Sequence, residues 1–305
     1  MPDILVVGSL NADLVVRAPR FPQPGETISG EDLQVISGGK GANQAVAAAR
    51  LGAKVSMVGR VGEDNFGDYL LNNLKANNVD IQFVRRDNAS TGTAIIIVDS
   101  NGQNSIVLSA GANGNVTSAD VKSASFADHK LVLLQLEIPT GTVLSAAQGA
   151  RENGLRVILN PAPAKPLPNE LLSLVDYLIP NENELSLLTG LPVNDIASAE
   201  TAAGALLARG IKNIIITLGK QGALAISNEQ VKHVDAYKVD VVDSTAAGDA
   251  FIGGFATALI QEKSLEEAVR YGCACGALAT TKFGAQPSLP TKEEVEHFVD
   301  AQRGG

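Results

Sequence analysis

The sequence predicts an α/β fold in which a doubly wound, mostly parallel sheet is flanked by helices and carries a small antiparallel β lid. Three observations lead to this prediction. Apolar runs of strand length alternate with Ala- and Leu-rich amphipathic segments, some strands are apolar almost throughout, and two segments hold strand patterns with no helix between them. Strands buried on both faces are typical of parallel sheets, and right-handed crossovers place helices on both sides of such a sheet.

The alternating pattern assigns the elements of the main sheet in chain order. The expected strands are residues 4–8, 55–59, 131–136, 156–160, 176–179 and 213–218. The expected helices lie near residues 42–51, 65–77, 140–153, 182–189, 198–209, 248–261, 265–281 and 291–302. A further alternating apolar segment, Tyr237 to Val242, is expected to be a strand that leads into a turn at Asp243.

Residues 13–36 and 91–109 interrupt this rhythm. Both hold short strand patterns, and the turn from Ser100 to Gln103 contains Asn-Gly, a strong hairpin signal. We expect these segments to form a small antiparallel sheet that projects from a single domain spanning residues 1–305. An isolated small sheet keeps one face exposed unless it finds a partner, so it is expected to act as a lid, a dimer surface, or both.

Composition excludes some partners. The chain has 305 residues, a net charge of −9 and a pI near 4.9, which argue against nucleic acid or an anionic membrane as the main partner. No uncharged apolar stretch reaches the roughly 18 residues that cross a bilayer, and no basic region precedes the first strand, so neither a membrane span nor a signal peptide is expected. Cys273 and Cys275 lie too close together for an ordinary disulfide and suit a reduced, cytoplasmic setting.

The most informative motif covers residues 243–251. Ala246, Ala247 and Gly248 lie where the chain enters a helix, and side chains this small leave the first N–H groups of the helix open to an anion. Asp249, in the first turn, places a carboxylate beside that anion, where it could take a proton from a hydroxyl that attacks phosphorus. The alternative is a helix that starts with small residues and uses Asp249 as a cap, and this motif alone does not separate the two.

Two earlier segments suit a polyhydroxylated ligand. Residues 38–43 form a Gly-rich helix entry that matches neither a Walker A loop nor a dinucleotide fingerprint, and its Lys40 and Asn43 side chains can approach sugar hydroxyls. Asn11 and Asp13 follow the first strand, at the edge where open α/β sheets bind ligands. A flexible Gly-rich turn and an Asx turn are the alternative interpretations.

Polar residues also follow the later strands. Glu137 ends one buried strand, and Asn181 and Glu184 open the helix after another. These positions suit phosphate, or Mg²⁺ that keeps most of its waters, but they equally suit helix caps. Residues 217–222 form a Gly-rich turn suited to a nucleotide. The three histidines lie outside every candidate loop, so no histidine chemistry is expected: His129, His233 and His297.

Taken in order along the chain, these motifs resemble the ribokinase family of carbohydrate and nucleoside kinases, which includes fructokinases and adenosine kinases. The resemblance extends from Ile4 to about Val299 and rests on residues 8–13, 24–27, 38–45, 135–137, 159–163, 180–182, 217–219, 243–249 and 284–288. It implies phosphorylation of the 5-hydroxyl of D-ribose by MgATP, and a homodimer formed through the β lid.

The resemblance also implies a role for each matching residue. Ribose would be bound by Asn11, Asp13, Gly39, Lys40, Asn43 and Glu137, with Asp249 as the base and Ala246, Ala247, Gly248 and Asp249 as the anion hole. ATP would contact Asn181, Thr217, Leu218, Gly219, Lys220, Gln221, Gly222 and Gly248, with Glu184 near Mg²⁺. K⁺ would be held by Asp243, Thr245, Ala279, Lys282, Gly284 and Ser288. Cys273 stands where ribokinases often carry a His near the adenine, which puts the base contact there in doubt.

Other assignments remain open on sequence alone. Another sugar or nucleoside kinase, such as a deoxyribokinase or a fructokinase, would use the same chemistry. A non-catalytic sugar or nucleotide sensor would have no need of a base at Asp249. A dinucleotide-dependent dehydrogenase would need the glycine fingerprint that this chain lacks.

Overall fold

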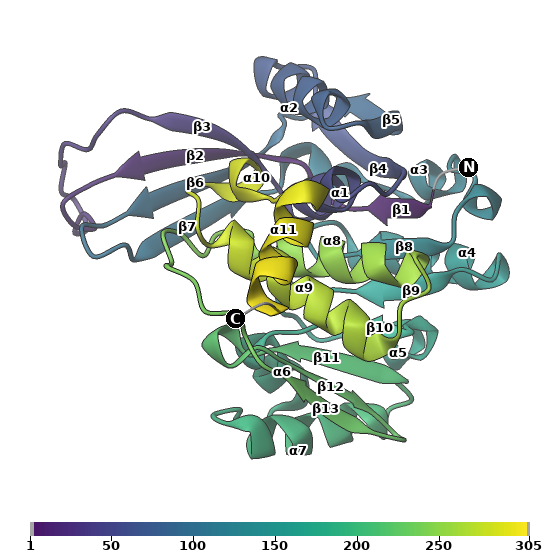
Figure 1. Cartoon of the computed structure of the whole chain (residues 1–305). Coiled ribbons are helices and arrows are strands. Elements are labelled where there is room, and N and C mark those ends of the chain that lie inside the picture. The colour runs from purple at the N-terminus through teal and green to yellow at the C-terminus, as the bar shows by residue number, and fades with distance from the viewer. Residues whose placement is uncertain (1–2, 304–305) are drawn as a thin grey trace.

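The computed structural model describes residues 3–303. Within these residues the chain forms a nine-stranded sheet covered by helices and a four-stranded sheet that extends away from it, on the left in Figure 1. The expected single domain of residues 1–305 also includes residues 1–2 and 304–305, which lie outside the described residues. The large sheet flanked by helices confirms the fold class.

The large sheet is parallel over most of its width. In spatial order its strands are β13 (Val231–Val234), β12 (Ala223–Ser227), β11 (Asn213–Thr217), β10 (Tyr177–Leu178), β9 (Arg156–Leu159), β8 (Leu131–Leu134), β1 (Ile4–Val7), β4 (Val55–Gly62) and β5 (Val79–Asp87). Within the described part of this sheet, only the pairings β11–β12 and β12–β13 are antiparallel. Apart from Tyr237 to Val242, all the strands expected for this sheet form. Strands β5, β12 and β13 were not predicted, because β5 and β13 are partly polar edge strands and β12 follows β11 without the intervening helix that the alternating pattern assumes.

Helices cover both faces of this sheet. They are α1 (Lys40–Arg50), α2 (Asn65–Ala76), α3 (Ser118–Lys122), α4 (Thr140–Glu152), α5 (Asn169–Leu174), α6 (Glu182–Thr189), α7 (Ile196–Leu207), α8 (Ala247–Ile260), α9 (Leu265–Ala279), α10 (Ala285–Ser288) and α11 (Lys292–Arg303), with short 3₁₀ turns η1 (Gly111–Asn115), η2 (Phe126–Asp128) and η3 (Gly219–Gln221). Every helix expected from the sequence forms, with bounds that differ by a residue or two.

Strand β1 shows why two cores result. Ile4 and Val6 pack into a cluster with residues of α1, α2, α8 and α9, whereas Leu5 and Val7 pack into a second cluster with residues of α3, α4, α5 and α7. All these strand residues are fully buried, since successive side chains of a strand point to opposite faces and both faces are covered. The strand order reverses around β1, whose neighbours are β4 and β8, so its carboxyl end is a switch point where such sheets bind ligands.

The small sheet begins at that edge. Its strands are β3 (Gln34–Gly38), β2 (Asn11–Arg17), β6 (Gly92–Val98) and β7 (Asn104–Ser109), in this spatial order. The expected hairpin connects β6 and β7, and the β2–β3 pairing is antiparallel, but the central β2–β6 pairing is parallel. The lid is therefore mixed rather than wholly antiparallel, because β2 and β6 both run outward from the large sheet (Figure 1).

The expected strand at Tyr237 to Val242 does not form. Residues 235–243 are neither helix nor strand, and Val241 and Val242 are exposed. The N–H groups of Val242 and Asp243 instead donate to the carbonyl of Thr280, at 2.8 and 3.1 Å, so this segment is tied to the end of α9 rather than to a neighbouring strand. Alternating apolar residues alone could not reveal that difference.

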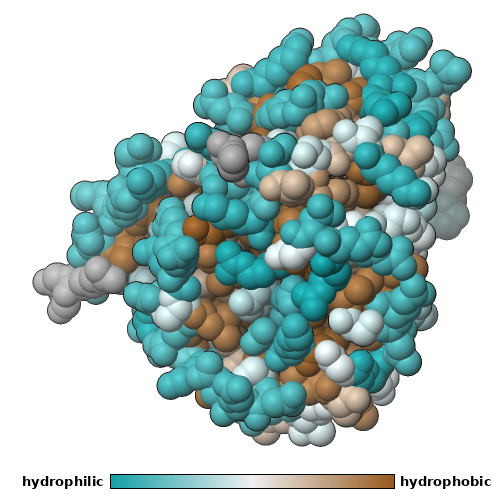
Figure 2. Space-filling view, turned by 90° about the vertical axis from the view of Figure 1, so that its right-hand side faces the viewer, coloured by the Kyte–Doolittle hydropathy of each residue, from teal (hydrophilic) through white to brown (hydrophobic). Residues whose placement is uncertain are grey.

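The exterior is mostly polar. Figure 2 shows the side of the molecule away from the lid, where hydrophilic side chains cover most of the surface and apolar ones show between them. Within residues 3–303, no helix has the length and apolar character needed to cross a membrane.

Helices α1 and α8 approach each other closely enough to bring their first turns together. A Cβ placed on Gly253 of α8 would lie 2.5 Å from Cβ of Ala47 and 3.0 Å from the backbone nitrogen of Ala48, both on α1. Contacts that short do not occur without movement of one helix. The absence of a side chain at Gly253 therefore sets the spacing between the two helices.

We expect Gly253→Ala to destabilise the protein although alanine favours helix. Overpacking costs about 1–3 kcal/mol, which outweighs a helix-propensity gain of about 1 kcal/mol. Gly204→Ala in α7 is the matched control, because nothing lies within 4 Å of the added Cβ, and it should stabilise slightly. Urea unfolding compares the two variants, and equal stability for both would contradict the packing argument.

Candidate active site

The turn before α8 leaves two backbone donors open. Ala246 takes a left-handed conformation, with φ 59°, and serves as the N-cap residue of α8. The N–H of Ala247 donates to the Ser244 carbonyl at 3.2 Å, whereas the N–H groups of Gly248 and Asp249 have no partner among the described residues. Open N–H groups at a helix N-terminus can bind an anion, so this turn is a candidate anion site and its role stays a prediction.

The carboxylate of Asp249 is buried beside this anion site. Asn43 Nδ2 donates to its Oδ2 at 2.9 Å, and Gln44 Nε2 donates to its Oδ1 at 3.0 Å. Both donors belong to the first turns of α1. The structure thus brings Asn43 and Asp249 together from positions about two hundred residues apart, as the expectation of a shared site requires.

Two glycines shape the start of α1. Gly39 has φ +88°, a conformation that favours glycine, and an added Cβ there would lie 2.7 Å from the Asn11 nitrogen. An added Cβ on Gly38 would lie 2.1 Å from Oδ2 of Asp13. Where the lid begins, Asn11 pairs with Gly38 of β3 and with Gly92 of β6. The lid strands and the start of α1 therefore meet next to the Asp13 carboxylate.

Charges are concentrated around this point. Burial, and after it the nearby carboxylates of Glu137 and Asp249, raise the pKa of Asp13 to about 7 although Lys40 lowers it. Burial would lower the pKa of the Lys40 ammonium, but the carboxylates of Asp249, Glu137, Glu184 and Asp13 together raise it. Lys40 therefore stays charged as the counter-ion of an acidic cluster.

Glu137 joins the same cluster through short contacts. Ser9 Oγ donates to its Oε2 at 2.5 Å, and the backbone N–H of Lys40 donates to the same oxygen at 3.0 Å. The carboxylate of Glu137 thus caps the start of α1 and sits where β8 ends. It connects the segments of Ser9, Lys40 and Glu137 itself, which the sequence predicted to lie at the same edge of the sheet.

A cavity of about 210 Å³ opens onto Asp249. Its lining contains residues expected for both substrates and several that were not expected: Lys40, Asn160, Ile179, Asn181, Glu184, Thr217, Ser244, Ala246, Gly248, Asp249 and Ile252. The anion site, the candidate base and the candidate nucleotide residues therefore face one space.

Asn181 and Glu184 pair with each other at the start of α6. The side chain of Asn181 accepts from the Glu184 N–H at 2.8 Å, and the Glu184 carboxylate accepts from the Asn181 N–H at 2.9 Å, which is a capping box. Burial raises the pKa of Glu184. The helix-cap interpretation of these residues is therefore correct, while both also line the cavity.

The Gly-rich loop after β11 forms a tight turn. Leu218 is buried, whereas Lys220 and Gln221 are exposed, and the Leu218 N–H donates to the Gly222 carbonyl at 2.8 Å. His233 lies on β13, outside this loop as expected, but it contacts the Gln221 carbonyl through Nε2 at 2.7 Å, so one histidine packs beside a candidate loop. Strand β12 folds back from this loop and brings β13, with its histidine, beside it.

Asp243 joins the two segments proposed for a monovalent cation. Its Oδ1 accepts from the N–H and the hydroxyl of Thr245, at 2.9 and 2.7 Å, and its Oδ2 accepts from the Gly284 N–H at 2.9 Å. Lys282 Nζ donates to Glu294 at 2.6 Å, so its ammonium turns toward α11. Ala279 and Ser288, the other two members of the expected cation site, are both buried.

Cys273 lies away from the cavity. It is buried in α9, burial raises the pKa of its thiol to about 12, and it is not among the cavity-lining residues. A contact between Cys273 and the adenine thus stays a prediction.

Several buried polar residues at the site were not predicted from the sequence. They are Ser9, Gln44, Asn113, Gln135 and Asn160. Asn113, for example, donates to Asn11 Oδ1 at 2.7 Å and binds both backbone groups of Leu10. Gln44 and Gln135 lie in two of the segments that carried the resemblance, and Gln135 also interrupts an apolar run, which indicates a buried hydrogen-bond partner.

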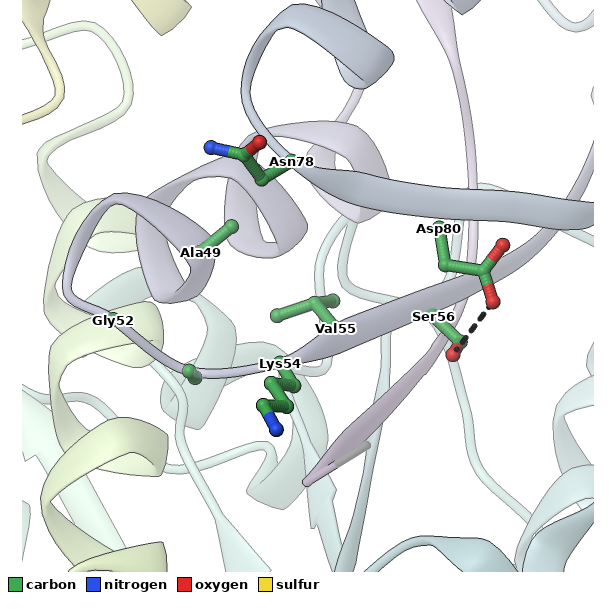
Figure 3. A pocket seen from close by; sticks show the side chains of 8 residues that line it. Ala49, Gly52, Lys54, Val55, Ser56, Asn78 and Asp80 are labelled. Carbon is green, nitrogen blue, oxygen red and sulfur yellow. Dashed lines mark hydrogen bonds between the residues drawn. The ribbon is translucent and has the colours of Figure 1, made fainter. Parts of the chain in front are cut away.

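A second hollow does not belong to this site. It measures about 520 Å³ and lies between the end of α1 and the first residues of β4 and β5. Lys54, Asn78 and Asp80 are among the residues that line it (Figure 3). These are the amino ends of the strands, opposite to the edge that carries Asp249. Parallel α/β sheets bind their ligands at the carboxyl ends.

Comparison with known proteins agrees with this geometry. A ribokinase from Haemophilus influenzae is 44% identical over 300 residues, covering 97% of this chain and 98% of that protein. A deoxyribokinase from Salmonella typhi is 38% identical, covering 97% and 98%. The structure of Arabidopsis thaliana ribokinase complexed with ribose and ATP superposes with a TM-score of 0.90 at 36% identity, covering 97% of this chain and 98% of that one.

The family model for pfkB family carbohydrate kinases matches residues 1–292, nearly the whole chain. The motifs that carried the resemblance lie within that range, and the residues around Asp249 converge on one site. This chain belongs to the pfkB family of carbohydrate kinases.

Proposed function

We propose that the protein transfers the γ-phosphoryl group of ATP to the 5-hydroxyl of D-ribose, giving D-ribose 5-phosphate and ADP. One observation carries this proposal: the buried Asp249 carboxylate lies beside the open N–H groups at the start of α8 and faces a cavity shared with Lys40 and Thr217. A pure binding protein has no use for a carboxylate at that point, whereas a kinase needs a base there. Relatives named ribokinase, at up to 44% identity among those compared, support ribose as the acceptor.

Ribose is bound, in this proposal, by the polar cluster under the lid. Asn43 supports this role, because its Oδ1 is buried and has no partner among the described residues while its Nδ2 is held by Asp249. A sugar hydroxyl would satisfy that oxygen. Asn11, Asp13, Gly39, Lys40 and Glu137 complete the proposed sugar site.

During transfer, Asp249 accepts the proton of the 5-hydroxyl as that oxygen attacks the γ-phosphorus and the bond to the ADP oxygen breaks. The open amides of the turn that begins at Ala246, those of Gly248 and Asp249 among them, stabilise the negative charge on the transferring group. Residues 217–222 and Asn181 bind the nucleotide. Among the described residues no three His, Cys, Asp or Glu side chains gather to hold a metal, which suits Mg²⁺ held mainly by phosphate oxygens and water near Glu184. Mg²⁺ would neutralise charge on the phosphates.

A monovalent cation, K⁺, is proposed to bind between the two segments that Asp243 connects. The donors fit such an ion: one carboxylate, the Thr245 hydroxyl, and carbonyls of Ala279, Lys282, Gly284 and Ser288, with the Lys282 ammonium turned away. Bound there, the ion would hold the neighbouring turn rigid. Turnover in K⁺ compared with Na⁺ at constant ionic strength tests this site.

We also propose that a second copy packs on the lid. Because β6 and β7 are antiparallel, Ile95 and Val107 lie opposite each other on one face, while Ile106 and Leu108 lie on the other. All four side chains are about half exposed or more, which is costly for apolar groups in a monomer. Light scattering that finds only monomer at micromolar concentration would contradict the dimer.

The base is tested by Asp249→Asn. We expect normal folding but a fall in kcat of at least about a hundredfold, the usual scale for loss of a general base. A coupled assay of ADP release measures it, with D-ribose, 2-deoxyribose, fructose and adenosine as acceptors. Wild-type turnover that is fastest with 2-deoxyribose would replace ribose as the substrate, a possibility raised by the deoxyribokinase relative. Near wild-type turnover of the variant would rule out Asp249 as the base.

Ribose binding should depend on pH through Asp13. The carboxylate form binds hydroxyls through charge-assisted hydrogen bonds, and the pKa of Asp13 in the free protein is about 7. Affinity should therefore rise as pH rises, by about tenfold per unit below pH 7, and then level off. Calorimetric titration with ribose and with ATP at pH 5.5 to 8.5 checks this.

Asp13→Asn is the control for that titration. The variant should bind ribose weakly at every pH, with no slope, and should bind ATP like the wild type. Because the pKa of Asp13 is higher in the folded than in the unfolded protein, protonated Asp13 stabilises the folded wild type below about pH 4. This contribution to the free energy of unfolding should be lost as the pH rises to 7, and Asp13→Asn should not show that loss. A slope that survives in Asp13→Asn would assign the pH dependence to another group.

A further inference from the structure

Gln44 has a single possible orientation in this structure. Its Oε1 accepts a hydrogen bond from Gln135 Nε2 at 2.7 Å, so its amino group must face the other way. That group donates to Asp249 Oδ1 at 3.0 Å and, more weakly, to Asn160 Oδ1 at 3.4 Å. The amides therefore form a directed series that runs from Gln135 through Gln44 to the candidate base.

The Asn160 end of the series is fixed by a further hydrogen bond, whereas Gln135 Oε1 is buried without a partner among the described residues. Asn160 Nδ2 donates to the Ile179 carbonyl at 3.0 Å, which turns its oxygen toward Gln44. Gln135 follows β8 and fits because Gly8 has no side chain: an added Cβ there would lie 2.1 Å from Gln135 Oε1. Gln44 and Gln135 are both fully buried. Water therefore has no access to replace either amide.

Gln44 acts behind the site rather than in it. Asp249, Lys40 and Asn160 line the cavity, but Gln44 and Gln135 do not. The terminal torsion of an aspartate is broad, so burial alone does not fix the plane of its carboxylate. Asn43, the other donor to Asp249, is also a proposed ribose ligand, which leaves Gln44 as the donor that no substrate contact disturbs.

We propose that Gln44, held by Gln135, is the positioning residue that fixes the Asp249 carboxylate in the orientation needed to take the proton of the acceptor hydroxyl. This proposal rests on the proposed function. It assigns a role in the chemical step to two residues that contact neither substrate, and it makes the end of β8 a support for the base.

The test is a double-mutant cycle in the full-length protein. We expect Gln44→Met, which keeps the length of the side chain, to lower kcat about tenfold with KM for ribose and ATP within twofold, because only the orientation of the base is lost. In the Asp249→Asn background the same substitution should change the residual rate less than twofold. Calorimetric affinities for both substrates should stay near those of the wild type.

Two further variants keep the test decisive. Gln44→Met/Gln135→Met removes both partners of one hydrogen bond, so it leaves no orphaned donor and should fold and match Gln44→Met in kcat even if the single variant is unstable. Gln148→Met is the matched control, since its amide also donates to a carboxylate, Glu170 at 2.9 Å, but at the surface, and its kcat should be unchanged.

Three results would each overturn the positioning role. They are an unchanged kcat in Gln44→Met, a change in KM instead of kcat, and an equal loss of kcat when the same substitution is made in the Asp249→Asn background. Failure of the wild type to phosphorylate any sugar would overturn the proposed function instead. The experiment therefore distinguishes a failure of the positioning role from a failure of the proposed function.

Discussion

The site depends on one contact, between the first turn of α1 and the first turn of α8. Asp249, on α8, is buried, and amides of Asn43 and Gln44, on α1, donate to its two oxygens. That contact is possible because Gly253 lets the two helices approach, and because Gly39 lets the chain turn directly from the lid into α1. The same turn of α1 carries Lys40, whose backbone N–H binds Glu137. Hydrogen bonds therefore join the candidate base, its counter-ion and the proposed sugar-binding groups into one unit, and the lid begins at that unit.

Electrostatics within this unit explain why it suits a polyhydroxylated ligand and a polyanion together. Burial and neighbouring carboxylates raise the pKa of Asp13, and the same carboxylates keep Lys40 charged. Asp13 and Glu137 lie where the lid begins, whereas Gly248, Asp249 and Thr217 line the cavity. In the proposed function, hydroxyls would meet acceptors at the first place and phosphates would meet donors at the second.

Much of this could be predicted from the sequence, because period and burial determine it. The apolar runs predicted β1, β8 and β11, and small residues followed by Asp249 predicted the start of α8. Prediction failed where a tertiary contact decides the outcome. Residues 237–242 alternate like a strand, but the N–H groups of Val242 and Asp243 bind the end of α9, and the β2–β6 pairing of the lid is parallel. Gln44 and Gln135 lie in segments that carry the family resemblance, but no role followed for them from the sequence, and only the hydrogen bonds to Asp249 and to each other indicate one. His233 reaches the loop 217–222 through a β-hairpin that its polar sequence did not reveal.

The central claim is that Asp249 faces the acceptor hydroxyl and the anion site at once. A crystal structure of Asp249→Asn with D-ribose and ATP bound tests it most directly, because the variant should hold both substrates without turnover. The account predicts the 5-hydroxyl within about 3 Å of the residue 249 side chain, pointing toward the γ-phosphate, with that phosphate at the N–H groups that begin α8. A sugar whose 5-hydroxyl points away from residue 249, or a γ-phosphate bound elsewhere, would contradict the account.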